Sequence, residues 1–240
     1  MSRVSMSQTP QLLANLAAVH AAIKAACLRG NRKMADINLM AVTKYAADED
    51  VLTLLDTHQI KHIGESRVQQ ATARWQQPIF AKHTVIKHFI GHLQKNKAAQ
   101  AAALFDFIDS IDNIETAQQL DFHANKLHKV LHVLIQIKLT ERVSQSGISL
   151  QEAPRLLGQL RQLPHIHPCG YMAIAPQTND TQRLRLLFSQ VKKAFDRDFP
   201  AGQERYLSLG MSNDFETAVE EGSTLPRVGS KLFTQHLEEL

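Results

Sequence analysis

"INLMAVTKYAADEDVLTLLDTHQIKHIGES", residues 37–66, has the pattern of one strand–helix–strand unit. It begins with a short apolar run containing β-branched residues, 37–45, which is typical of a buried strand. An acidic first turn then predicts a helix over 48–59. "HIGES", 62–66, predicts the next strand. A repeated unit of this kind predicts a parallel sheet whose strands are joined by helical crossovers.

The same alternation continues to the end of the chain. Further strands are predicted at 84–91, 105–111, 129–139, 166–175, 206–211 and 225–230, and further helices at 67–77, 93–104, 113–127, 149–163, 181–196 and 213–222. Apolar residues from Leu12 to Cys27 recur at helical spacing and predict one extra helix in front. Eight such units predict an α/β fold, a single TIM-like (β/α)8 barrel that spans residues 1–240 as one domain. A doubly wound open sheet is the competing interpretation, although no glycine-rich dinucleotide turn follows the first strand.

Composition narrows the class of protein. No stretch approaches the roughly 20 apolar residues that cross a bilayer, and the start lacks a signal-peptide pattern, so neither a membrane protein nor secretion is expected. An organelle transit peptide is the alternative for the acid-poor start. Two distant cysteines, Cys27 and Cys169, fit a reducing cytoplasm. The net charge of +4 is spread along the chain, without the basic run and interleaved aromatics of a nucleic-acid-binding protein.

Lys44 ends the first predicted strand, where barrels of this kind place their reactive groups. One interpretation is that its amine reaches solvent or pairs with Asp48 or Glu65. The other is a neutral amine that attacks a carbonyl and forms a Schiff base. Spacing alone leaves both open.

The closing stretch "LSLGMSNDFETAVEEGSTLPRVGS", 207–230, places small hydroxyls and one arginine after the last two strands. Ser212 suits a helix start, where Glu216 would complete a capping arrangement. A helix start also presents free N–H groups to an anion, and the loops after strands seven and eight are a frequent phosphate site. The residues of "RVGS" that suit an anion are Arg227, Gly229 and Ser230.

In a closed barrel the first strand is a neighbour of the last two. A lysine amine on one side and a phosphate cradle on the other would hold a phosphorylated aldehyde at both ends. This combination points to pyridoxal 5′-phosphate (PLP). The histidine pairs in "HFIGH" (88–92) and "HIHP" (165–168) lack an evident third ligand, so no metal site is predicted.

Eight motifs follow in order: "AVTKY", "IGESRVQQ", "HFIGHLQKNK", "FIDSIDN", "QSGI", "GYMAIAP", "LSLGMSNDFETAVEEGST" and "RVGS". On these motifs the chain resembles the pyridoxal phosphate homeostasis protein family, whose members have an alanine racemase N-terminal-domain fold. The resemblance implies a single PLP fold-type III barrel and a Schiff base between PLP and Lys44. It places Ser212, Gly229 and Ser230 at the phosphate and Arg227 against the pyridine nitrogen.

Three other strand-end residues are expected to contact PLP: Ser66, His88 and Met211. The sequence also departs from the family pattern. Ser66 stands where asparagine is usual, Lys87 replaces a common tryptophan, and Gln145 replaces a lysine. The ending "FTQHLEEL" lacks the usual glycine-arginine-tyrosine. These departures are expected to affect the affinity for PLP and its delivery.

The resemblance implies a protein that binds PLP and takes part in intracellular vitamin B6 homeostasis and delivery. The cysteine usage predicts a cytoplasmic protein, and a small single-domain barrel favours a monomer. PLP-dependent apoenzymes are its expected transient partners. No appreciable enzyme activity is expected, because a cation at Arg227 disfavours protonation of the ring nitrogen and so weakens the ring as an electron sink. The barrel also uses the whole chain, leaving no second domain to supply an opposing base. The alternatives are a fold-type III racemase or decarboxylase, and a barrel that works through protein contacts without a cofactor.

Overall fold

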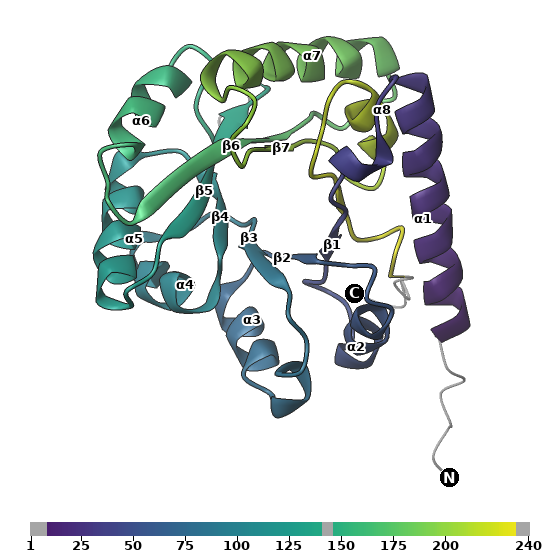
Figure 1. Cartoon of the computed structure of the whole chain (residues 1–240), viewed down its shortest axis with the longest axis horizontal. Helices are drawn as coiled ribbons and strands as arrows, with labels where there is room; N and C mark the ends of the chain where they lie inside the picture. Colours follow the sequence, from purple (N-terminus) through teal and green to yellow (C-terminus); the bar gives the residue numbers. More distant parts are fainter. Residues whose placement is uncertain (1–8, 141–145, 234–240) are drawn as a thin grey trace.

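The computed structural model describes residues 9–140 and 146–233, and in these residues eight parallel strands form a nearly closed barrel (Figure 1). The strands are β1 (Met40–Val42), β2 (His62–Glu65), β3 (Ile86–Phe89), β4 (Phe107–Ile111), β5 (Leu131–Lys138), β6 (Ile166–Ile174), β7 (Tyr206–Ser208) and β8 (Arg227–Val228). They pair in chain order from β1 to β7, and β8 pairs with β1. The predicted barrel is confirmed, and the open-sheet alternative is wrong.

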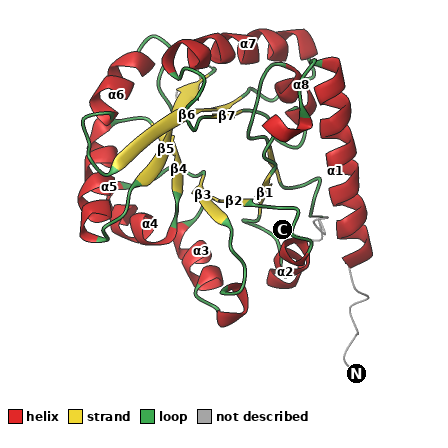
Figure 2. Ribbon diagram, in the orientation of Figure 1, coloured by secondary structure: helices red, strands yellow, loops and turns green. Residues whose placement is uncertain are grey.

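Helices cover the outside of the barrel (Figure 2). They are α1 (Thr9–Arg29), α2 (Asp48–Asp56), α3 (Val68–Trp75), α4 (Ala98–Leu104), α5 (Ile114–Lys126), α6 (Ala153–Leu160), α7 (Thr181–Asp198) and α8 (Phe215–Glu220). Side-chain caps fix two of the helix starts. The Asn113 side chain accepts from the N–H of Thr116 at 2.8 Å, and Asp180 accepts from the N–H of Arg183 at 3.0 Å. Each cap satisfies a backbone donor that the helix itself leaves free.

The extra N-terminal helix, α1, lies alongside α8 (Figure 1). Its buried stripe contains the predicted residues Leu12, Leu16, Val19, Ile23 and Cys27. By length and composition α1 could cross a membrane, with a mean hydropathy of 1.4, in contrast to the prediction from the sequence that no stretch would do so. A core helix of a soluble protein satisfies the same criterion, and the buried stripe of α1 packs on the barrel.

The barrel closes differently at β7 and β8 than elsewhere. No ladder joins these strands in the described residues; instead the N–H of Arg227 donates to the carbonyl of Gly210 at 3.0 Å. Gly210 has φ 85°, and a Cβ there would lie 2.6 Å from the Cβ of Ala218. The position therefore requires glycine. The backbone leaves regular pairing at this seam and turns over the carboxyl end of the barrel.

Candidate cofactor site

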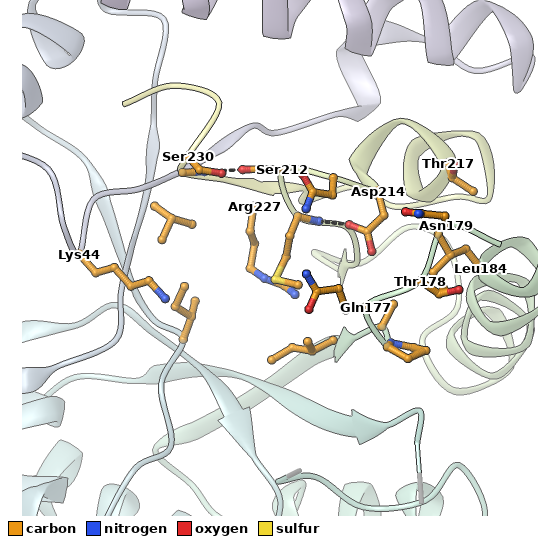
Figure 3. A pocket seen from close by; sticks show the side chains of 18 of the residues that line it. Lys44, Gln177, Thr178, Asn179, Leu184, Ser212, Asp214, Thr217, Arg227 and Ser230 are labelled. Atoms are coloured by element: carbon orange, nitrogen blue, oxygen red, sulfur yellow. Dashed lines mark hydrogen bonds between the residues drawn. The ribbon is translucent and has the colours of Figure 1, made fainter. Parts of the chain in front are cut away.

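A cavity of about 790 Å³ opens at the carboxyl ends of the strands. Its walls come from the segments that follow β1, β6, β7 and β8 (Figure 3). This is the end of the barrel at which enzymes of this architecture bind their ligands. Of the predicted site residues, the structure brings together at this cavity Lys44, Met211, Ser212, Arg227, Gly229 and Ser230.

The side chain of Lys44 extends into the cavity (Figure 3). Its Nζ lies 5.1 Å from the ring centroid of Tyr45. In the described part of the chain Lys44 forms no ion pair, because Arg74 engages both nearby carboxylates: Nε contacts Asp48 at 2.7 Å and Nη1 contacts Glu65 at 2.8 Å. Pairing of Lys44 with either acid, one of the sequence interpretations, is therefore wrong. The amine is free to meet a ligand.

Glu65 lies beneath this loop and is 1% exposed. Burial raises the pKa of Glu65, while hydrogen bonds from Thr43 and Arg74 act in the opposite direction. The Thr43 hydroxyl donates to Glu65 at 2.7 Å. This carboxylate thus anchors the residue that precedes Lys44.

Ser212 does not cap α8 as the sequence suggested. The helix begins at Phe215, and its N-cap residue Asp214 makes no side-chain cap bond. Glu216, the expected capping partner, pairs with Arg29 on α1 instead. The Asp214 carboxylate accepts from the N–H of Met211 at 2.6 Å, which closes the turn before the helix.

The freed Ser212 hydroxyl faces β8. It accepts a long hydrogen bond of 3.3 Å from the N–H of Gly229. A Cβ at Gly229 would lie 3.2 Å from the carbonyl oxygen of Val42, a tight approach that glycine avoids. Together with Ser230, which is exposed at the cavity wall, these residues provide hydroxyl and backbone donors of the kind that bind a phosphate.

Arg227 is 4% exposed, yet it lines the cavity. Its Nη1 donates to the carbonyl and hydroxyl of Ser208, both at 2.7 Å, and its Nη2 to the carbonyl of Ala173 at 2.9 Å. Burial lowers the pKa of Arg227, and the charges of Asp109 and Asp214 act in the opposite direction. The guanidinium is thus held in one orientation without a carboxylate at ion-pair distance among the described residues.

Two predicted residues lie away from the cavity wall. His88 is fully buried, with Nδ1 at 2.9 Å from Asp109 and Nε2 at 2.9 Å from Nδ1 of His62. Ser66 is half-buried after β2, and its backbone lies beneath Gly91. Their contact with a cofactor stays a prediction.

Of the other residues that depart from the family pattern, Lys87 does not line the cavity. The Lys87 amine lies 5.7 Å from the ring centroid of Trp75, and Gln145 is outside the described residues. For the histidine pairs, residues 9–140 and 146–233 contain no group of three or more potential metal ligands.

Sequence reasoning missed one arm of the cavity. Figure 3 shows Thr178, Asn179, Leu184 and Thr217 at the end opposite Lys44. These residues come from the loop after β6, from α7 and from α8. The polar run "PQTND", 176–180, between strand and helix was the available signal. It also missed Ser208, whose inward position is visible only once Arg227 is placed.

Comparisons with known proteins agree with this arrangement. Residues 16–236 match the family described as alanine racemase, N-terminal domain. The chain is 33% identical over 224 residues to the pyridoxal phosphate homeostasis protein of Pasteurella multocida, covering 91% of this chain and 95% of that protein. The structure of PipY from Synechococcus elongatus with PLP bound is 32% identical, with a TM-score of 0.75, covering 88% and 99% of the two chains. Alanine racemase of Clostridium difficile shares the fold alone: 16% identity, TM-score 0.71, covering 95% of this chain and 57% of the racemase.

Proposed function

The chain belongs to the pyridoxal phosphate homeostasis protein family, built on the alanine racemase N-terminal domain, and we propose that it binds PLP and acts in vitamin B6 homeostasis as a carrier. One observation carries the proposal. An uncommitted lysine amine, a buried guanidinium and a hydroxyl–glycine cradle line the same cavity. Relatives named for PLP homeostasis and a similar structure with PLP bound support it.

The residues fit the cofactor group by group. PLP supplies an aldehyde that condenses with a primary amine, and Lys44 is the amine on the cavity wall. Ser212, Gly229 and Ser230 would bind the phosphate. From the family resemblance, Arg227 would face the pyridine nitrogen, and its bonds to Ser208 and Ala173 hold the guanidinium in one orientation.

The charge of Arg227 favours a carrier over an enzyme. A guanidinium beside the pyridine nitrogen keeps that nitrogen unprotonated, and an unprotonated ring withdraws electrons from a bound amine weakly. The ring then assists carbanion chemistry only weakly. Racemases of this fold tolerate that weakness and place a base on each face of the ring, so the runner-up function, a racemase or decarboxylase, needs a second base opposite Lys44 as well.

Borohydride trapping tests the proposal. Purified protein is incubated with PLP, reduced with borohydride and digested, and the labelled peptide is identified. We expect label on Lys44 and none in Lys44→Ala. Lys231→Ala is the matched control, because Lys231 is exposed and follows Ser230 directly. Label on another lysine, or no capture by the wild-type protein, contradicts the proposal.

Amino acid turnover separates the carrier from the enzyme. The PLP-loaded protein is assayed for racemisation and decarboxylation of the common amino acids, and we expect no turnover at enzyme-like rates. Arg227→Gln tests the reason, since loss of the cation should move the pH dependence of the visible absorption of bound PLP. An unchanged pH dependence would mean that Arg227 does not lie beside the ring nitrogen.

We further infer a cytoplasmic monomer that meets PLP-dependent apoenzymes transiently. A carrier must release its cargo, so the contact with a recipient is expected to be short-lived. Size-exclusion chromatography with light scattering tests the monomer. Transfer of PLP from the loaded protein to an apoenzyme, measured against free PLP at equal concentration, tests delivery.

A further inference from the structure

Arg74 lies on α3, outside the cavity, yet its guanidinium reaches the loop that carries Lys44. The side chain is 13% exposed. Besides Asp48 and Glu65, it binds two backbone carbonyls: Nη1 donates to Thr43 at 2.9 Å and Nη2 to Ala46 at 2.6 Å. Four acceptors thus converge on one side chain.

The two carbonyls bracket Lys44. Thr43 directly precedes the lysine, and Ala46 lies two residues after it. The N–H of Ala46 donates to the carbonyl of Thr43 at 3.0 Å, so these residues form the two ends of one turn. Arg74 binds both ends of that turn at once. A planar fork of donors suits this task, whereas a single ammonium does not.

The same guanidinium also holds two acids, Asp48 and Glu65. Asp48 also accepts from Nε2 of Gln77 at 2.8 Å, and Glu65 also accepts from Thr43. Without Arg74, both carboxylates would lack their cation. The nearby Lys44 amine would then be the natural replacement partner.

We propose that Arg74 is a positioning residue: it holds the turn that presents Lys44 to the cavity and keeps Asp48 and Glu65 from pairing with the amine. This inference rests on the proposed role of Lys44 in binding PLP. Arg74 itself is not among the residues that line the cavity. Its effect on PLP is therefore through the lysine.

The test compares Arg74→Met with Arg205→Met. Arg205 also binds a carbonyl, that of Phe199, and a carboxylate, that of Asp196. It directly precedes β7, at the opposite end of the barrel from Lys44. PLP affinity is measured by equilibrium titration at a temperature at which every variant is folded, and capture at Lys44 is confirmed by borohydride trapping.

Both variants are expected to lose stability, but only Arg74→Met should lose affinity. If the released turn presents the amine about a tenth of the time, the apparent Kd rises about tenfold. Arg205→Met should stay within about twofold of wild type. Wild-type affinity in a folded Arg74→Met overturns the inference.

Two further measurements keep the test decisive. Arg74→Lys keeps a cation but cannot bind all four acceptors, so its Kd should lie between those of the wild type and Arg74→Met; wild-type affinity in this variant also overturns the inference. Hydrogen exchange at residues 43–47 without PLP should accelerate in the Arg74 variants and not in Arg205→Met. If the wild-type protein failed to capture PLP, the proposed function would be refuted. The role of Arg74 in holding the turn would still be tested, because hydrogen exchange is measured without PLP.

Discussion

Two groups of polar side chains lie in this barrel, and they differ in what surrounds them. At the cavity, Lys44 and Arg227 face open volume (Figure 3). Deeper in the barrel, both nitrogens of the His88 ring are engaged, one by Asp109 and one by His62. The three residues His62, His88 and Asp109, here called the interior cluster, are each at most 3% exposed.

The difference separates binding from structure. Members of the interior cluster use their hydrogen-bonding capacity on one another, which makes their burial tolerable. The Lys44 amine has no such partner among the described residues, and the cavity gives a ligand access to it. A polar side chain inside the barrel therefore indicates a ligand site only where it faces open volume. The two groups are also linked, because the charge of Asp109 favours the cationic form of Arg227.

Loss of Asp109 should have the largest effect on stability. Asp109→Ala leaves the buried His88 Nδ1 without its partner and removes a charge that favours the Arg227 cation. Removing one member of a buried pair costs about 3 kcal/mol. Asp214→Ala is the control at the cavity, where removal of the bond to Met211 should cost about 1 kcal/mol. Urea unfolding measures both. Equal losses would mean that the interior cluster is no more structural than the cavity wall.

Acid should weaken the interior cluster next. Burial lowers the pKa of His62 to about 3, and the charges of His88 and Lys61 act in the same direction. The unfolded chain protonates His62 near its ordinary pKa of about 6.5, and the folded chain only near 3. The stabilisation is thus present above pH 6.5 and is lost as the pH falls toward 3. Between pH 7 and pH 5 the loss should be about 2 kcal/mol.

Unfolding by urea at the two pH values measures this loss. In His62→Gln this loss of stability between pH 7 and pH 5 should vanish, because glutamine does not titrate. His128→Asn is the control, since His128 is exposed and has φ 50°, which asparagine tolerates. A His62→Gln protein as acid-sensitive as the wild type would place the titration elsewhere.

The sequence predicted the order of strands and helices because hydrophobic periodicity and the turn and capping residues between elements are local properties. It predicted less well where elements end. The last strand was expected over 225–230, yet β8 contains only Arg227 and Val228. The following residues leave the ladder and form the cavity wall. Pairing partners and turns determine such ends, and neither is local.

The site was predictable where the barrel architecture decides it, because the carboxyl ends of all the strands lie together at one end of a closed barrel. That rule brought Lys44 and Ser212 together. It could not give the depth of a side chain, and His88, expected to contact PLP, is fully buried and does not line the cavity. Nor could it find Arg74 or Ser208, whose contacts join segments distant in sequence.

Ser212→Ala should have the smallest effect on the free energy of unfolding and still reduce PLP affinity clearly. Ser212→Ala removes only the 3.3 Å bond from Gly229, so the free energy of unfolding should fall by less than about 1 kcal/mol. Loss of a hydroxyl from a phosphate site removes a charge-assisted bond, and PLP affinity should fall about tenfold.

Ser223→Ala is the opposite case. The buried Ser223 hydroxyl bonds to the carbonyls of Leu207 and Leu209, so the free energy of unfolding should fall and PLP affinity should not. Titration with PLP and urea unfolding of both variants test the pair. If Ser212→Ala loses stability and keeps its affinity, the cavity wall is structural in the same sense as the interior cluster.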